Sequence, residues 1–467
     1  MRLLGLFSAV VLSVTPATAL LQTRTEATAT PPAPTPAASV GELVEGVKVP
    51  YEQFTMPNGL RVVVHEDRKA PVVSVATWYN VGSKDEPKGK TGFAHLFEHI
   101  MLFNGTENVP NLTEVLRDVG ATDWNGTTWF DRTNYFETVP TPALERALFL
   151  ESERMGHLLG ALTQERLDNQ RGVVQNEKRQ NDNNPFGLVP YALLETLFPE
   201  GHPYRHTTLG SMADLDAATL DDVRTWFREN YGPNNAVLVL SGDIDARSAR
   251  PLVQRYFGHI RRGPQNIPAA AGVPTLAKPV AQVMQDRVAN TRLYRNWAVP
   301  GRSDPAIVPL EIAASVLGGL ASSRLDNELV RGDQTAVSVT AGLQPHQRVG
   351  LFQVVVDVKP GADPDAVSRR LDEIMARFLR EGPTTDEVQR AAMRAVSERI
   401  AALEPVGGRA AGKSLVLAEG ALYHDDPGFY VRQLQDYARV TPASVRAAAR
   451  RWLTRPVYAL RVDPGPR

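Results

Sequence analysis

The strongest constraint on the fold is an internal repeat, in which similar segments recur about 221 residues apart. Residues 162–177, LTQERLDNQRGVVQNE, match residues 383–398, PTTDEVQRAAMRAVSE, in a threonine, an acidic start and the apolar positions. Residues 218–227 likewise match residues 440–452, and a strand-like apolar run follows each of them. A repeat of this length predicts two similar halves, each built from helices and strands.

The order of the predicted elements sets the fold class. Residues 49–83 contain alternating, valine-rich runs around a Pro-Asn-Gly turn, which predicts a hairpin at the start of a sheet. Helical patterns follow, and a buried strand is predicted near residues 235–244. We therefore expect an α+β fold of two homologous α/β halves, each a mainly antiparallel sheet with helices packed on it.

Composition shifts divide the chain into five segments. Residues 1–19 have a positive start, a short apolar run and a small-residue end, which predicts a signal peptide and export. Residues 20–43 are rich in Pro, Ala and Thr and predict a disordered tether. A catalytic half at 44–262 and a non-catalytic half at 280–467 are separated by a Pro- and Ala-rich linker at 263–279. No stable membrane span is expected once the signal peptide is removed.

Charge and cysteine content exclude several kinds of function. The 51 basic and 52 acidic residues give a formal net charge of −1, so no overall field favours nucleic acid. The chain has no cysteine, which excludes disulfides, thiolate metal sites and a cysteine nucleophile. Any metal ion must therefore be bound by His, Asp or Glu.

The stretch GFAHLFEHIMLFNG, residues 92–105, has the pattern of a metal site on a helix. His95 and His99 are four residues apart, so both imidazoles lie on one helix face and can reach one ion. Glu98 lies beside them, where a carboxylate can contact a metal-bound water without being a ligand. This is the H-E-x-x-H arrangement in reverse order. Because the neighbouring residues are apolar, unpaired polar groups here would be costly.

A third ligand is needed, since a catalytic zinc ion takes three protein ligands and keeps one position open. Helical spacing places Gln170, Val173, Val174 and Glu177 on one face of a second helix, and a glutamate on such a stripe is a candidate buried ligand. We select Glu177. Two histidines, His202 and His206, remain alternatives. The second half has the apolar helix VPLEIAASVLGGL in place of the histidine motif, so we expect the chemistry in the first half.

Four segments together resemble a known family: HLFEHIMLFNGT, RGVVQNE, HPYRHTTLGS and YGPNNAVLVLSGDID. They are similar, in the same order, to the pitrilysin and insulinase group of inverted-motif zinc peptidases. The likeness is greatest to the two-domain subgroup that includes mitochondrial processing peptidase, and it covers the chain from about residue 50 onward. It implies a clam-like pair of halves around a peptide chamber and one Zn²⁺ per chain, held by His95, His99 and Glu177, with Glu98 as general base.

The resemblance also implies where a peptide binds. Residues 123–137 correspond to the family's edge-strand region, where a peptide adds as an extra strand, and Asn125 matches the residue directed at the substrate backbone.

The chain departs from the family in two places. Gln170 stands where the family usually has a second glutamate, so its contact to a metal ligand would be a neutral hydrogen bond. Arg324 and Arg331 are candidates for the arginine that contacts the substrate carbonyl. Val337 occupies the position of an expected tyrosine, so the sequence does not identify the group that stabilises the oxyanion.

We therefore expect an exported zinc metallopeptidase that hydrolyses oligopeptides or unfolded segments, as a homodimer or with a related non-catalytic chain. The alternative is a peptide-binding subunit of a two-chain peptidase that is inactive without its partner. An exported peptide- or metal-binding protein is a further alternative, but it would not require Glu98. Glycosylation sequons at Asn104, Asn111 and Asn125 lie near the expected site, where glycans would block it. We therefore expect the periplasm, with secretion as the alternative.

Overall fold

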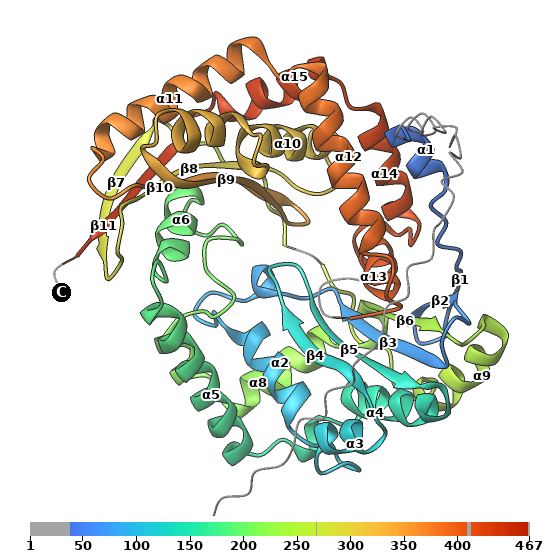
Figure 1. The fold of residues 1–467 in the computed structure, drawn as a ribbon. Helices are drawn as coiled ribbons and strands as arrows, with labels where there is room; N and C mark the ends of the chain where they lie inside the picture. Colours follow the sequence, from blue (N-terminus) through green and yellow to red (C-terminus); the bar gives the residue numbers. More distant parts are fainter. Residues whose placement is uncertain (1–37, 268, 409–411, 466–467) are drawn as a thin grey trace, which may run out of the picture. The chain divides into compact units, whose positions relative to one another are not determined.

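The computed structural model describes residues 38–267, 269–408 and 412–465, which form two β-sheets with helices packed against them (Figure 1). The predicted signal peptide and most of the predicted tether lie outside the described residues. The end of the tether is an exception, because residues 40–45 form helix α1 with Ser39 as its N-cap. The prediction of a disordered tether is therefore wrong for these last residues.

The first sheet has six strands in the order β1-β2-β6-β3-β5-β4. All neighbouring strands are antiparallel except β2 and β6, which are parallel. The predicted hairpin is present as β1 and β2, with Gly59 at a φ of +94° in its turn. The strands are β1 (Glu52–Thr55), β2 (Arg61–Glu66), β3 (Val72–Tyr79), β4 (Thr122–Thr128), β5 (Thr133–Pro140) and β6 (Ala236–Gly242).

The second sheet has five strands in the order β7-β11-β8-β10-β9, again with one parallel pair, β7 and β11. Strand for strand this order repeats β2-β6-β3-β5-β4 of the first sheet, so the predicted repeat is present in the topology. The strands are β7 (Val280–Asp286), β8 (Arg292–Pro300), β9 (Ala336–Pro345), β10 (Val349–Val358) and β11 (Tyr458–Pro464).

The helices repeat in the same way. The matched segments of the sequence form α5 and α12, and then α8 and α15, each of the last two preceding the final strand of its sheet. The longer helices of the first half are α2 (Phe93–Phe103), α3 (Leu112–Asp118), α4 (Leu144–Gly156), α5 (Gln164–Asn183), α6 (Val189–Leu197), α7 (Met212–Ala217), α8 (Leu220–Asn230) and α9 (Ala246–Phe257). Those of the second half are α10 (Ile307–Ala314), α11 (Pro364–Glu381), α12 (Thr385–Ala401), α13 (Lys413–His424), α14 (Phe429–Arg439) and α15 (Pro442–Leu453).

Short helical turns complete the chain. Four are 3-10 turns at Ser83–Asp85, Thr141–Ala143, Leu159–Ala161 and Pro233–Asn235, and two are π-helical segments at Ser315–Gly319 and Asp326–Gly332. None of the described helices combines the length and hydrophobicity needed to cross a lipid bilayer.

Each half contributes one helix to the other half's sheet. Helix α6 packs on β8 and β11, and its Leu194 and Leu197 share a core with Leu460 of β11. Helix α13 packs on β3 and β6, where Leu417 and Leu422 contact the outer face of the first sheet. Figure 1 shows the green α6 beside the yellow strands and the orange α13 beside the blue strands. The halves are therefore joined by exchanged helices as well as by the linker.

Strand β4 lies at the free edge of the first sheet and β9 at the corresponding edge of the second. Helix α2 packs against β4 and against α5, so three elements from distant parts of the sequence meet at one edge. The candidate site lies at this junction.

Candidate metal centre and active site

Helix α2 is fixed at both ends by buried polar contacts. Gly92 caps it with a φ of +95°, and a Cβ there would lie 2.9 Å from the Leu209 carbonyl oxygen, so only glycine fits. The buried Glu86 accepts hydrogen bonds from the Gly92 and Ala94 amides, at 2.9 and 2.7 Å. Burial raises the pKa of Glu86 well above its usual value. Near the other end, the Arg154 guanidinium donates to the Met101 carbonyl at 3.0 Å.

Three potential metal ligands meet beside α2. One ligand atom from each of His95, His99 and Glu177 lies within 4.8 Å of the others. The Glu177 Oε2 atom is 3.4 Å from the His99 Nε2 and 3.8 Å from the His95 Nε2. A tetrahedral zinc ion with bonds of about 2.0–2.1 Å holds its ligand atoms about 3.3 Å apart, so this set fits one ion after a small contraction.

The electrostatics of the cluster favour the forms that bind metal. Burial lowers the pKa of His95 to about 4, and the nearby His99 shifts it in the same direction. A hydrogen bond from His99 holds the pKa of Glu177 below its usual value, against partial burial. A neutral imidazole and an ionised carboxylate are the states that coordinate zinc. At neutral pH the chain therefore presents a neutral imidazole at His95 and an ionised carboxylate at Glu177.

Glu98 is buried on the same helix and is not part of the ligand cluster. Burial raises its pKa, and a hydrogen bond from the Thr128 side chain partly offsets this shift. Strand β4 comes so close that a Cβ on Gly126 would lie 2.9 Å from the Glu98 Cγ. A carboxylate with a raised pKa beside a metal cluster is suited to accept and release a proton.

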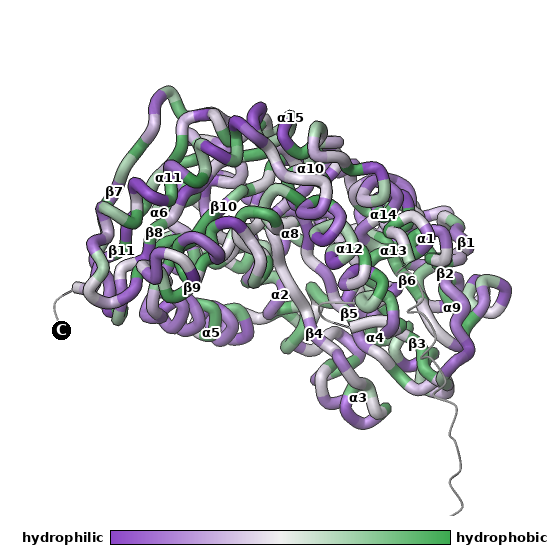
Figure 2. The backbone as a smooth tube through the Cα atoms, turned by 45° about the horizontal axis from the view of Figure 1, so that its top comes forward, coloured by the Kyte–Doolittle hydropathy of each residue, from purple (hydrophilic) through white to green (hydrophobic). Residues whose placement is uncertain are grey.

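Glu177 is set by α5, whose orientation differs in part from the sequence-based prediction. The buried residues of α5 are Leu167, Gln170, Val174 and Lys178. Val173 is 45% exposed and the Glu177 side chain is 42% exposed, so the predicted valine-lined face is rotated toward solvent. The reason is composition, since α5 is mostly hydrophilic (Figure 2) and packs along a narrow stripe only. Glu177 lies at the rim of that stripe, facing the two histidines.

Gln170 is buried on α5, one helical turn before Val174 and on the same face. Its Nε2 donates to Asn169 at 3.3 Å, and its Oε1 is buried without a hydrogen-bond partner among the described residues. The Nδ1 atoms of His95 and His99 are also buried without a partner within this part of the chain. A contact from Gln170 to a ligating histidine stays a prediction.

The two histidines considered as alternative ligands have other partners. The His202 Nε2 lies 2.9 Å from the Gly272 carbonyl, and its Nδ1 accepts from the Tyr204 amide. The His206 Nδ1 lies 3.2 Å from the Thr207 carbonyl and 3.6 Å from Glu86. Neither belongs to the cluster, so the structure favours Glu177 as the third member.

Strand β4 is an edge strand, as the resemblance implies for residues 123–137. It pairs only with β5 within the described sheet, so its other edge offers free backbone groups. Asn125 lies on β4 at a register irregularity, and its Oδ1 accepts from the Gly126 amide at 2.9 Å. The second strand of the segment, β5, is interior. The sequence analysis missed Gly126 and Thr128, although both lie in the stretch chosen for Asn125.

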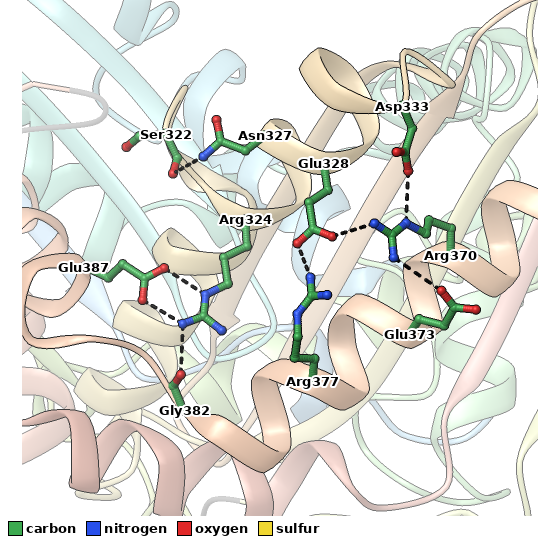
Figure 3. A network of polar contacts seen from close by, with 10 residues as sticks. All are labelled: Ser322, Arg324, Asn327, Glu328, Asp333, Arg370, Glu373, Arg377, Gly382 and Glu387. Atoms are coloured by element: carbon green, nitrogen blue, oxygen red, sulfur yellow. Dashed lines mark hydrogen bonds and ion pairs between the residues drawn. The ribbon is translucent and has the colours of Figure 1, made fainter.

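The two arginines predicted to contact substrate are paired with carboxylates of the second half. Figure 3 shows one of these pairs, Arg324 with Glu387. Arg324 donates to both Glu387 oxygens at 2.8 Å and to the Gly382 carbonyl at 2.9 Å. Arg331 is 59% exposed and its Nε lies 3.2 Å from Asp326. Their role with substrate stays a prediction. Val337 is exposed on β9.

Comparison with known proteins identifies the same family in both halves. Residues 61–210 match the description "Insulinase (Peptidase family M16)", and residues 217–394 match "Peptidase M16 inactive domain". A relative from Helicobacter pylori, named zinc protease PqqE, is 27% identical over 364 residues, covering 76% of this chain and 80% of the relative.

Solved structures share the fold. A protease from Helicobacter pylori superimposes with a TM-score of 0.80 at 23% identity, covering 89% of this chain and all of that one. The first half of the periplasmic protease PqqL from Escherichia coli gives a TM-score of 0.72 at 17% identity, covering 89% and 92%. The predicted α+β fold of two homologous halves is thus confirmed.

Proposed function

Because this chain belongs to the insulinase family, peptidase family M16, we propose that it is a zinc metallopeptidase that hydrolyses oligopeptides or unfolded segments. The observation that carries the proposal is the meeting of the His95, His99 and Glu177 ligand atoms within 4.8 Å, with Glu98 buried alongside. A structural metal site would not require this fourth group. The name of the Helicobacter relative, a zinc protease, agrees with the proposal.

The donor set fits zinc better than other common ions. Two imidazoles and one carboxylate are typical zinc ligands, and three protein ligands leave one position open for water or substrate. When bound, zinc would lower the pKa of a coordinated water and polarise the carbonyl of the scissile bond. One ion per chain is expected, because the described residues contain one such cluster.

Glu98 is the proposed general base. Its carboxylate takes a proton from the attacking water and then donates that proton to the leaving amine. Its raised pKa suits both steps, since a strongly acidic carboxyl would hold the proton too weakly to deliver it. The contact between Gly126 and Glu98 keeps the carboxylate beside the edge strand.

Strand β4 is the proposed binding site for the peptide backbone. A peptide that adds to this edge forms main-chain hydrogen bonds that do not depend on its side chains. Asn125 would direct its side chain at the same backbone from the edge strand. The peptide would then pass directly over Glu98.

A specific observation supports a second candidate function, that of a peptide-binding subunit that needs a partner chain. Arg324 and Arg331 are engaged by carboxylates of their own half, and the side chain of Val337 has no hydrogen-bond donor. In this candidate a related chain supplies the group that stabilises the oxyanion, in a heterodimer. In the preferred function, Arg324 or Arg331 leaves its carboxylate partner and donates to the substrate carbonyl, in a homodimer.

We further propose export, with the periplasm as the destination. The N-terminal sequence has the composition of a signal peptide, and the similar half of an Escherichia coli protein belongs to a periplasmic protease. Mass spectrometry of native protein tests this assignment. Cleavage near residue 19 without glycan on Asn125 is the expected result, and a glycan on Asn125 would contradict it.

The test of function compares the mature protein with its Glu98→Gln variant. Both forms should bind about one zinc ion by elemental analysis. Cleavage of a mixed peptide library should fall by about 10²–10⁴-fold in the variant, because the general base is lost. The matched control is Glu229→Gln, which changes an exposed glutamate at the end of α8. It should keep both properties.

The outcomes separate the candidates. Cleavage by the native form alone supports the peptidase. Zinc in both forms without cleavage by either favours the peptide-binding subunit. Absence of metal from both forms rejects the metal site itself.

A further inference from the structure

A cavity lies directly beyond the end of strand β4. It has a volume of about 520 Å³ and is formed by both halves of the chain. The first half contributes Trp129 and Phe130, which follow β4, and Leu193 and Leu194 of the exchanged helix α6. The second half contributes the face of β10 that carries Leu351 and Val355. The walls are therefore mainly apolar and partly aromatic.

The cavity is continuous with the proposed peptide-binding edge. Gly126 of strand β4 lies against Glu98, the strand ends at Thr128, and Trp129 is the next residue and lines the cavity. An extended peptide advances about 3.3 Å per residue. A side chain about two or three residues from a bond held beside Glu98 would therefore reach the cavity. Phe186, which also lines the cavity, follows the helix that carries Glu177.

The charged residues of the cavity neutralise each other. Arg292 donates to Asp357 through two nitrogens, at 2.6 and 3.1 Å, and its guanidinium stacks on the Phe186 ring at 3.7 Å. Asp357 also accepts from Ser338 at 2.8 Å. A charged ligand would have to break this pair or remain unpaired in an apolar site, and either is costly. The cavity is thus suited to an uncharged group.

Exposed apolar side chains continue from the cavity to the metal cluster. Phe103 is 44% exposed, and its ring lies 5.5 Å from the His99 ring. Val173 is exposed one turn before Glu177 on α5, and Leu188 is exposed beside the cavity residue Val189. Trp129 is 53% exposed at the cavity wall. Exposed apolar groups gathered around one site indicate a surface that binds an apolar partner.

We propose that this cavity is a specificity subsite for a large, uncharged apolar side chain of the peptide substrate, such as Leu or Phe. The bound side chain belongs to a residue about two or three positions from the scissile bond. This inference rests on the proposed peptidase function, because the peptide is placed by β4 and Glu98. It adds a substrate class, namely peptides with an apolar residue at one fixed distance from the cut.

The first measurement uses the Glu98→Gln variant, so that binding is observed without hydrolysis. A series of short fluorescent peptides carries Phe, Leu, Ala, Glu or Lys at one position and is otherwise identical. Fluorescence anisotropy measures the Kd of each peptide. The Phe and Leu peptides should bind at least about tenfold more tightly than the Ala peptide, as expected for burial of a large apolar side chain. The Glu and Lys peptides should bind no better than Ala.

The second measurement fills the cavity. Thr340 is an exposed residue of β9 that lines it, and Thr340→Trp should reduce the preference for Phe over Ala to about twofold or less. The control is Gln285→Trp, which places the same side chain at an exposed position on β7, away from the cavity. It should keep the preference of the parent protein. Thr340→Glu should shift the preference toward the Lys peptide.

Mapping of cleavage sites in the native protein completes the test. Cuts that fall at a constant two or three residues from Phe or Leu support the subsite. Cleavage with equal binding of Phe and Ala peptides overturns the subsite and leaves the peptidase standing. A preference for Phe in the Glu98→Gln variant, without cleavage by the native form, supports the subsite and counts against the peptidase.

Discussion

The two halves of the chain place the same three elements together and use them differently. In the first half, α2, α5 and the edge strand β4 surround the cluster of His95, His99 and Glu177. In the second half, α10, α12 and the edge strand β9 surround a cavity of about 220 Å³. There the gap between helices is bridged by an ion pair, with the Arg399 Nη2 atom 2.8 Å from Glu311. Tyr437 donates a further hydrogen bond to Glu311.

The difference shows how one scaffold serves two purposes. In each half, the two helices beside the edge strand carry polar side chains where they face each other, and these side chains need partners. Opposite charges in the second half satisfy each other and need no ion. The first half has two imidazoles and one carboxylate, a set of ligands that one metal ion completes. The four predictions below test this contrast in order of decreasing effect.

The largest effect is expected from removing one histidine. His99→Ala should reduce zinc binding below one ion per chain and lower peptide cleavage to background, since two protein ligands rarely hold a catalytic zinc. Elemental analysis and a peptide assay measure both. His259→Ala, at a histidine outside the cluster, is the control and should retain metal and activity. Full zinc content in His99→Ala would show that the ion binds elsewhere.

The next effect compares a glycine in each edge strand. A Cβ on Gly126 would lie 2.9 Å from Glu98 and 3.2 Å from the Tyr135 ring, whereas a Cβ on Gly342 of β9 would meet nothing within 4 Å. Gly126→Ala should displace Glu98 and lower kcat by about 10²-fold, with zinc content unchanged. Gly342→Ala should leave kcat unaltered. Equal behaviour of the two variants would mean that β4 does not position Glu98.

These contacts also show what sequence can and cannot predict. The histidine motif was predictable, because helical spacing fixes which side chains share a face over one turn. The likeness of the two sheets was predictable from the repeat, but the order of the strands within each sheet was not. The exchange of α6 and α13 was not predictable either, since an amphipathic pattern states that a face is buried but not against which sheet.

The contact partners of individual side chains could not be predicted from the sequence either. The spacing of α5 suggested a face centred on Val173 and Val174, yet the helix packs through Leu167, Gln170 and Val174 instead. Arg324 was chosen for a role with substrate, and its carboxylate partner Glu387 comes from a helix about 60 residues later. Contacts of this kind are decided by tertiary packing rather than by local pattern.

A smaller effect is expected at Gln170, whose counterpart in the repeat is the buried Ala391. Gln170→Ala therefore gives the first half the residue of the second. If the Gln170 side chain orients a ligating histidine, zinc affinity should fall by about 10–100-fold. Competition with a chelator of known affinity measures the change. Ala391→Gln is the reverse substitution, and it should create no zinc site. Unchanged affinity in Gln170→Ala would remove Gln170 from the metal centre.

The smallest effect is expected from the ion pair that replaces the metal cluster in the second half. Glu311→Gln leaves Arg399 facing a neutral group and weakens the contact with Tyr437, so it should lower the free energy of unfolding by about 2 kcal/mol. Zinc content and peptide cleavage should stay unchanged, because His95, His99 and Glu177 of the proposed metal site all lie in the first half. Urea unfolding followed by circular dichroism measures the stability. Glu373→Gln, at an exposed glutamate on α11, is the control and should change it by less than about 0.5 kcal/mol. Loss of zinc from Glu311→Gln would show that the two helix pairs are coupled, and the functional separation of the halves would then be wrong.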